Sequence, residues 1–178
     1  MNTPMMDQHA ERTLIELAEE RRTRFYGKYR GVVQEALSGS DLGKLKVSVP
    51  DVLADVSCVA WPCVPFAGPS HGFVAIPEPG DGVWIEFEGG NPAQAIWVGC
   101  WWGSGDMPSP AGPKVRSWVT TKGLAIVLDD DQNQISLRHP DGPSVTLSSD
   151  SITFSTDAAT ITLNAQGISL QGITQVSE

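Results

Sequence analysis

The sequence predicts a mainly β protein with one short helix near its N-terminus. The 178-residue chain contains 18 Gly and 13 Pro, and its apolar residues, 40% of the total, fall in short regular runs. This combination is typical of β structure with many turns. Residues 7–24 are the only stretch with the apolar spacing of a helix. Beyond residue 114, pairs of apolar residues separated by one residue recur at short intervals.

The helix-like stretch belongs to a predicted N-terminal helical segment, residues 1–25. Leu14, Leu17 and Ala18 fall on one face of this helix, and charged residues surround them. Such a short apolar stripe does not hold a helix together alone in water. We therefore expect the helix to pack on a partner or on the domain that follows.

The pattern becomes that of β-strands from Tyr29 onward. Five strand-like segments, separated by Gly-rich and Pro-rich turns, suit a small closed barrel, for which the OB-fold is the commonest solution. The prolines among them are expected at strand ends and edges. We predict an OB-fold β-barrel over residues 26–103 and a Gly/Pro/Ser-rich linker over residues 104–114. The five segments are residues 29–37, 44–50, 57–68, 72–90 and 95–103.

Residues 115–178 contain an internal repeat of very short strands. Six apolar pairs follow one another at steps of 9, 10, 7, 9 and 7 residues, and Gly, Asp, Asn, Ser and Thr lie between them. Each strand places its two apolar side chains on one face. The pairs are Ile126/Leu128, Ile135/Leu137, Val145/Leu147, Ile152/Phe154, Ile161/Leu163 and Ile168/Leu170.

One chain cannot bury this single apolar stripe. A solenoid would need rungs of roughly 20 residues, with more apolar positions in each rung. Three copies around a threefold axis would turn every pair inward, and the short repeat favours this arrangement. We predict a triple-stranded intertwined β-helix in a homotrimer over residues 115–178, with the twelve paired residues as its core. At about 4.8 Å per rung, six rungs give a needle roughly 29 Å long. Folding and assembly are then expected to be one event.

The charge of the chain argues against nucleic-acid binding. The net charge is −9, and residues 31–178 hold six Lys or Arg against sixteen Asp or Glu. Binding to nucleic acid needs clustered Lys and Arg. No apolar run is long enough for a transmembrane helix, and no secretory signal is expected. An odd number of cysteines, three, is expected to remain as free thiols in a reducing cytoplasm.

Candidate chemical sites are few, and each has a simpler structural interpretation. Cys58 and Cys63 could bind zinc only if Cys100 and His71 completed the site, so buried apolar thiols are favoured over a metal or an adventitious disulfide. The run 129–131 of three Asp lacks the order of a calcium loop and is read as a solvated turn. His71 and Ser104 lie outside any nucleophile motif. We expect no catalytic residue, no metal and no cofactor.

The tryptophans could stack bases, as in some OB-folds. The acidic charge opposes this, and core filling with contacts to neighbouring subunits is favoured. The tryptophans concerned are Trp61, Trp84, Trp97, Trp101 and Trp102.

The stretch from Tyr26 to Gly103 resembles a known family in the order and spacing of its motifs. It resembles the phage baseplate assembly protein V family and the spike proteins of contractile injection systems. It is also similar to the OB domain of the type VI secretion valine-glycine repeat proteins. The motifs that carry the resemblance are YGKYRGVV at 26–33, GKLKVSVP at 43–50, WPCVP at 61–65, PGDGVWIEFEGG at 79–90 and IWVGCWWG at 96–103.

The resemblance implies a structural central spike in a contractile tail or injection system. It implies a homotrimer whose barrels sit on a baseplate hub protein and whose β-helix points at the target membrane, which it pierces when the sheath contracts. It implies no enzyme activity. Such a protein would be assembled in the bacterial cytoplasm and become part of a virion tail or an extracellular injection particle.

The C-terminal end departs from the family pattern. Many free-standing members end in a His-x-His metal site, whereas this chain ends with residues 172–178, GITQVSE. We therefore expect no tip metal, and we expect a separate tip protein of the PAAR-repeat kind to cap the needle. The alternative function is an OB-fold module that binds oligosaccharide or single-stranded nucleic acid and carries a trimerising β tail.

Overall fold

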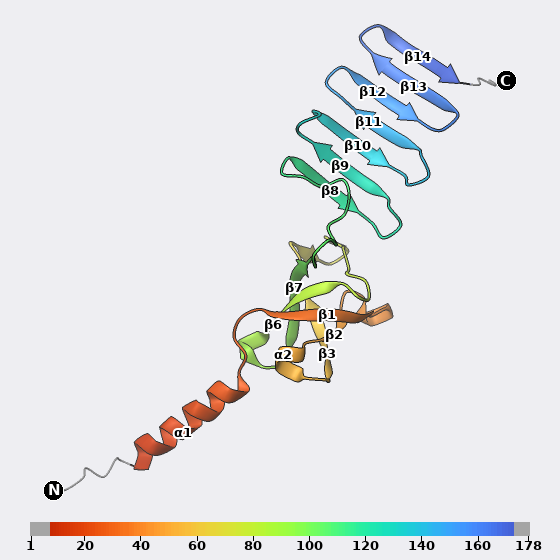
Figure 1. Cartoon of the computed structure of the whole chain (residues 1–178). Coiled ribbons are helices and arrows are strands. Elements are labelled where there is room, and N and C mark those ends of the chain that lie inside the picture. Colours follow the sequence, from red (N-terminus) through yellow and green to blue (C-terminus); the bar gives the residue numbers. More distant parts are fainter. Residues whose placement is uncertain (1–7, 173–178) are drawn as a thin grey trace. The chain divides into compact units, whose positions relative to one another are not determined.

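The computed structural model describes residues 8–172 and divides the chain into two units, Met1–Gly105 and Asp106–Glu178. The first unit contains a helix, α1 (Gln8–Thr23), and a small barrel; the second is a single sheet (Figure 1). The mainly β fold class is confirmed. Asp7, where the predicted helix begins, and the C-terminal residues 173–178 lie outside the described residues.

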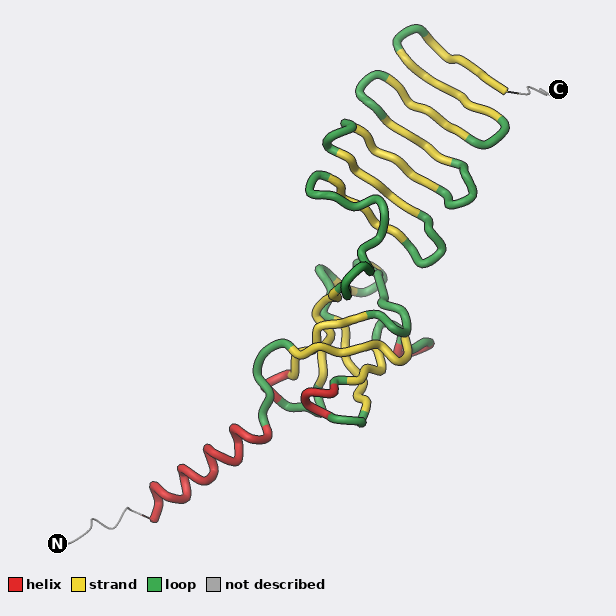
Figure 2. The backbone as a smooth tube through the Cα atoms, in the orientation of Figure 1, coloured by secondary structure: helices red, strands yellow, loops and turns green. Residues whose placement is uncertain are grey.

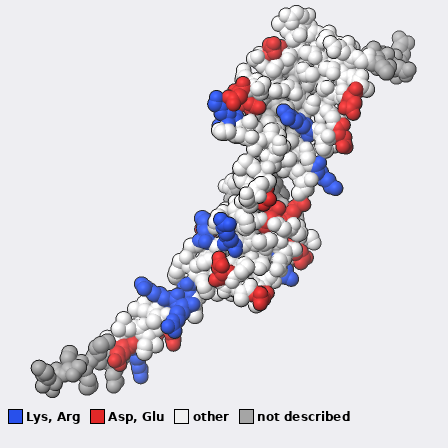
Figure 3. Space-filling model, viewed as in Figure 1, with Lys and Arg blue, Asp and Glu red and all other residues white. Residues whose placement is uncertain are grey.

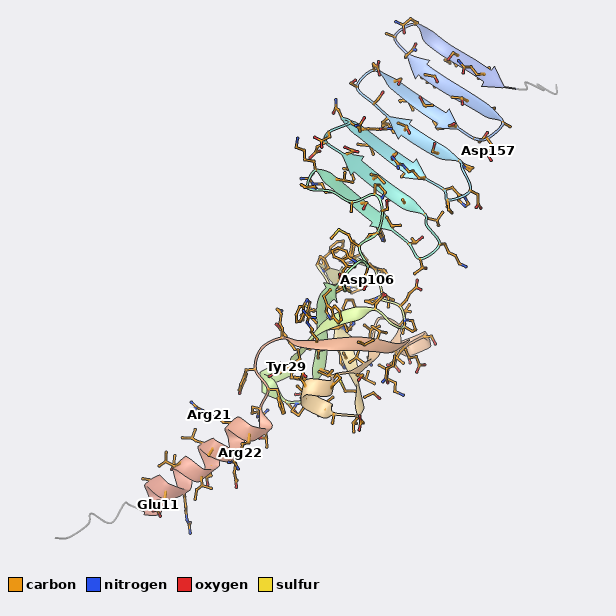
Figure 4. The ribbon with its side chains drawn as sticks, viewed as in Figure 1. Glu11, Arg21, Arg22, Tyr29, Asp106 and Asp157 are labelled. Carbon is orange, nitrogen blue, oxygen red and sulfur yellow. The ribbon has the colours of Figure 1, made fainter. Side chains whose placement is uncertain are left out.

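Helix α1 is present where the sequence predicts it. Its charges match the helix dipole, with Glu11 in the first turn and Arg21 and Arg22 in the last turn (Figure 4). Leu14 and Leu17, on the apolar face, are 56% and 51% exposed. The packing of this face on a partner stays a prediction.

Five strands close the barrel, as predicted. Their order is β1-β2-β3-β7-β6, and β6 returns to β1. The pair β3 and β7 is parallel, and the other neighbours are antiparallel. A short helix, α2 (Pro50–Leu53), joins β2 to β3. The strands are β1 (Tyr29–Ala36), β2 (Leu45–Ser48), β3 (Ser57–Pro62), β6 (Gly82–Phe87) and β7 (Ala95–Trp101).

Two of the predicted strands are shorter than the sequence pattern suggested. The segment at 57–68 ends its barrel strand at Pro62, and the segment at 72–90 begins its barrel strand at Gly82. A small hairpin of β4 (Ala67–Gly68) and β5 (His71–Gly72) lies between them. The prolines of this region remove backbone donors, so they exclude it from the barrel ladder.

Alternating side chains fill the barrel. On β6, Val83, Ile85 and Phe87 point inward while their neighbours are half-buried, and Leu45 and Val47 on β2 are fully buried. Gly31 on β1 permits close packing here. A Cβ at this position would lie 2.9 Å from Cγ1 of Ile85 and 3.2 Å from the Ser48 carbonyl oxygen.

The residues just before β1 fix the start of the barrel. The Phe25 amide donates to the Gly90 carbonyl at 2.8 Å, within the 3-10 turn η2 (Glu88–Gly90). The Phe25 ring packs against Tyr29 and Phe87, with ring centroids 6.1 and 6.2 Å away. An aromatic cluster therefore closes this end of the barrel core.

The C-terminal unit is a seven-stranded antiparallel sheet in which each strand pairs with the next one along the chain (Figure 2). Tight turns join the strands. The strands are β8 (Val115–Val119), β9 (Ala125–Asp129), β10 (Gln134–Arg138), β11 (Ser144–Leu147), β12 (Ser151–Ser155), β13 (Ala159–Asn164) and β14 (Gly167–Gly172).

This sheet differs from the predicted intertwined β-helix. Every one of the six predicted strands is present, as β9 to β14, but each pairs with its sequence neighbour inside one chain. The physical reason is the turns, which are short enough to join neighbouring strands of one chain as hairpins. Strand β8 is an addition that the apolar pattern missed, because its pair is Arg116 and Trp118.

The second half of the predicted linker contacts the sheet. The Ser117 hydroxyl donates to the Pro110 carbonyl at 2.9 Å, and Gly112 forms a β-bridge with Val115. Residues 106–114 therefore belong to the C-terminal unit.

Candidate functional site: the apolar face of the C-terminal sheet

The strand register gathers the predicted apolar pairs into two rows on one face of the sheet. Residues directly opposite each other on neighbouring strands share a face. Row A is Trp118, Ile126, Leu137, Val145, Phe154, Ile161 and Leu170. Row B is Arg116, Leu128, Ile135, Leu147, Ile152, Leu163 and Ile168.

Nothing in the single chain covers these rows among the residues that the structure describes. Eleven of the twelve predicted core side chains are between 36% and 71% exposed, and Val145 is half-buried. The largest exposures, 71% for Ile168 and 58% for Leu170, lie on β14. A continuous exposed apolar face of this size marks an interaction surface.

The opposite face of the sheet is polar. Its central row passes through Ser117, Val127, Ser136, Thr146, Thr153, Thr162 and Ser169. Val127 and Ser136 in this row are buried, and Arg138 donates from Nε to the Ser136 hydroxyl at 2.9 Å. In the view of Figure 3, most of the surface of this unit carries no charged side chain.

Row A lies at the bottom of a trough of about 680 Å³. Its floor is formed by the first six members of row A, from Trp118 to Ile161. One wall consists of the turns that join β8 to β9, β10 to β11 and β12 to β13, and it includes Leu124, Pro143 and Thr156. Row B lies outside this trough and lines two smaller hollows, of about 420 and 290 Å³, beside the turns at the other side of the sheet. Row A thus lines one continuous trough, whereas the hollows along row B are separate.

Charged side chains border the apolar face at its β8 end. Arg116, in row B, pairs with the Asp130 carboxylate and also donates to the Lys114 carbonyl at 3.2 Å. Lys114 Nζ lies 2.7 Å from Asp131 Oδ1. At the other end of the sheet no Lys, Arg, Asp or Glu occurs between Ala158 and Gly172. The face is thus ionic at one end and uncharged at the other.

The three consecutive aspartates form a turn, as predicted. Asp129 Oδ1 accepts hydrogen bonds from the amides of Asp131 and Gln132, both at 3.0 Å, while the other two carboxylates face cations. Within residues 8–172 no three His, Cys, Asp or Glu side chains are grouped so that they could hold a metal ion.

The cysteines are more exposed than expected. Cys58 is half-buried, Cys63 and Cys100 are exposed, and all three thiols are free. The prediction of buried apolar thiols is therefore wrong for Cys63, which follows β3, and for Cys100, which lies near the end of β7. Burial raises the pKa of Cys58, and a backbone hydrogen bond partly opposes this shift. Partial burial, with the charge of Asp81, raises the pKa of Cys100.

The other residues that the sequence singled out lie apart from one another. His71 is on the β4–β5 hairpin, where its Nδ1 lies 3.0 Å from the Pro69 carbonyl oxygen. Ser104 is exposed in the turn that follows β7. The structure brings neither of them to an acidic partner.

The tryptophans occupy two kinds of position. Trp97 is 5% exposed and donates from Nε1 to the Gly43 carbonyl at 3.0 Å, which confirms core filling at this position. On the barrel surface, Arg30 Cζ lies 5.5 Å from the Trp84 ring and 4.9 Å from the Trp101 ring. Lys44 lies 3.9 Å from the Trp61 ring. The cations of the chain itself thus cover a face of each of these indoles, where a base would stack.

The strand order defines the first unit as a barrel of the OB type, in which the first three strands form a meander and the third pairs in parallel with the last. Residues 29–102 match the family model described as the type VI secretion system/phage-baseplate injector OB domain. The match covers the barrel and bears out the resemblance over residues 26–103. The family described is a structural baseplate domain, and the match supports a structural role of the baseplate type.

The comparison with curated proteins finds no match for the chain. Among the described residues, no helix has the length and apolar character needed to cross a membrane.

Proposed function

We propose that this protein is the central spike of a contractile tail or injection system, and that it acts as a homotrimer. The observation that carries the proposal is the exposed pair of apolar rows, which follows an injector OB domain in the same chain. Three copies would turn these faces toward a common axis. In this role the protein supplies stiffness and shape, and sheath contraction supplies the work.

The free energy available from covering the rows is large. Full burial of one Ile, Leu or Phe side chain is worth about 1.5–3 kcal/mol. Since the twelve side chains are now roughly half exposed, covering them would contribute on the order of 10 kcal/mol per chain. This is comparable to the stability of a whole domain, so the face strongly favours assembly.

The trimer that we propose consists of three hairpin-linked sheets, each belonging to one chain. The apolar faces form the inside of a three-sided prism, and the polar faces form its outside. Seven strands at about 4.8 Å give an assembled sheet region roughly 34 Å long. The twelve predicted core residues then line the interior.

The two ends of the trimer would contact different partners. The OB domains would bind the hub protein of the baseplate, since the matching family is described as an injector domain of phage baseplates and type VI secretion systems. The uncharged β14 end would meet a PAAR-like tip protein and enter the target membrane first. An edge strand with its apolar residues exposed is a ready surface for such a cap.

The mass of the full-length protein tests this proposal. Light scattering behind size-exclusion chromatography should give the mass of three chains. A monomer at micromolar concentration would overturn the proposal. A dimer would point to two sheets packed face to face, which is the other way to cover a single apolar face.

A further inference from the structure

The trough along row A repeats with the strands of the sheet. It is floored by one apolar side chain from each of six consecutive strands. Row B presents six apolar side chains, one from each strand from β9 to β14. Because the rows share one sheet, they have the same strand-to-strand spacing. From β9 to β13 both rows are apolar at every strand, so row B of one copy has the repeat to pack against the trough of another at these five levels.

We infer that row A of one copy packs against row B of the next copy, strand by strand, around the threefold axis. This inference rests on the proposed trimer. A threefold ring uses heterologous contacts, in which two different patches meet, and it closes after three copies. Rotation about the axis does not change height, so strand β10 of one copy faces strand β10 of the next. Each trough therefore receives the neighbour's row B, and no like rows need to meet.

The ends of the rows agree with this alignment. On β8, row A has Trp118 and row B has Arg116. The strand-by-strand pairing puts Arg116 of one copy beside Trp118 of the next, where a guanidinium and an indole attract each other. A shift by one strand would instead place the Arg116–Asp130 pair on an apolar neighbour, at a desolvation cost. The ionic end of the face thus favours one register.

Charge complementation at the β10 level tests the pairing in the full-length chain. Leu137→Lys puts a charge in row A, and Ile135→Glu puts the opposite charge in row B. Each variant alone should lose the trimer. Co-expression of the two should restore three-chain particles that contain both variants in a 2:1 ratio. One of the three interfaces then pairs the introduced ammonium group with the introduced carboxylate, which leaves one unpaired charge in place of three. Native mass spectrometry gives the composition of these particles.

A mismatched pair is the control. Ile152→Glu carries the same charge in row B, but on β12, and its co-expression with Leu137→Lys should yield no mixed trimer. Circular dichroism checks that every variant keeps its β content.

The outcomes distinguish a failure of the row pairing from a failure of the spike proposal. Mixed trimers with the β10 pair alone support the row pairing. Equal yields from both mixtures, or no mixed trimer from either while the wild-type protein is trimeric, would overturn it and leave the spike proposal standing. A monomeric wild-type protein would overturn both the row pairing and the spike proposal.

Discussion

Leu137 lies in the middle of row A and is 48% exposed in the single chain. Leu137→Asp would place three carboxylates inside the proposed prism at one height, and each unpaired buried charge costs about 3–5 kcal/mol. The variant should be monomeric by light scattering.

Thr146→Asp is the matched control, because Thr146 lies on the opposite, polar face. This variant should remain trimeric. If both variants assemble equally well, the apolar face does not point inward.

A substitution at Gly31 tests the close packing of the barrel core. Gly31→Ala adds a methyl group that meets Ile85 and the Ser48 carbonyl oxygen, so it should destabilise the barrel by about 1–3 kcal/mol. Thermal unfolding measures the loss. Glu35→Ala, at an exposed position of the same strand, should leave the melting temperature nearly unchanged.

The sequence predicted many individual residues well and a few badly. Apolar alternation located the buried side chains of β2, and it placed both members of each of the six pairs on one face of a strand, since side chains alternate with a period of two. It could not give the exposure of Cys63 and Cys100, because that depends on which strand ends of the barrel remain uncovered. The sequence also could not show that Arg30 stacks on Trp84 and Trp101, since β1 lies far along the chain from β6 and β7.

At the scale of elements, the turn between β9 and β10 is held by one side chain. Asp129 accepts two backbone hydrogen bonds. Asp129→Ala should therefore lower the stability of the C-terminal unit by about 1–3 kcal/mol. Chemical denaturation followed by circular dichroism measures this loss. Ser149→Ala, in the exposed turn that follows β11, should have a much smaller effect.

Element existence was easier to predict than element pairing. Helix α1, the five barrel strands and the six repeat strands all followed from spacing and turn residues. The predicted intertwining did not, because a two-residue period is the same whether the neighbouring strand comes from the same chain or from another. Strand β8 escaped notice because Arg116 interrupts its apolar pair.

At the scale of the whole molecule, the two units should respond differently to protein concentration. The barrel has its own buried core, whereas the apolar face of the sheet is exposed in the single chain and would be covered by other copies in the proposed trimer. The unfolding temperature of the C-terminal unit should therefore rise with concentration, by mass action, while that of the barrel stays constant. Differential scanning calorimetry at two concentrations a hundredfold apart checks this. If neither unfolding temperature changes with protein concentration, the proposed assembly is contradicted.

The hairpin order of the sheet also has a kinetic consequence. Each strand finds its partner within the next few residues of the chain, and contacts between close neighbours form in microseconds to milliseconds. In the proposed trimer the sheet would thus form soon after it leaves the ribosome, before it meets another copy, which differs from the expectation that folding and assembly are one event. Association is then a separate, second-order step, and its rate depends on how many chains are made together. A newly made chain passes through an interval with its apolar face open to the cell, and that interval shortens as synthesis speeds up.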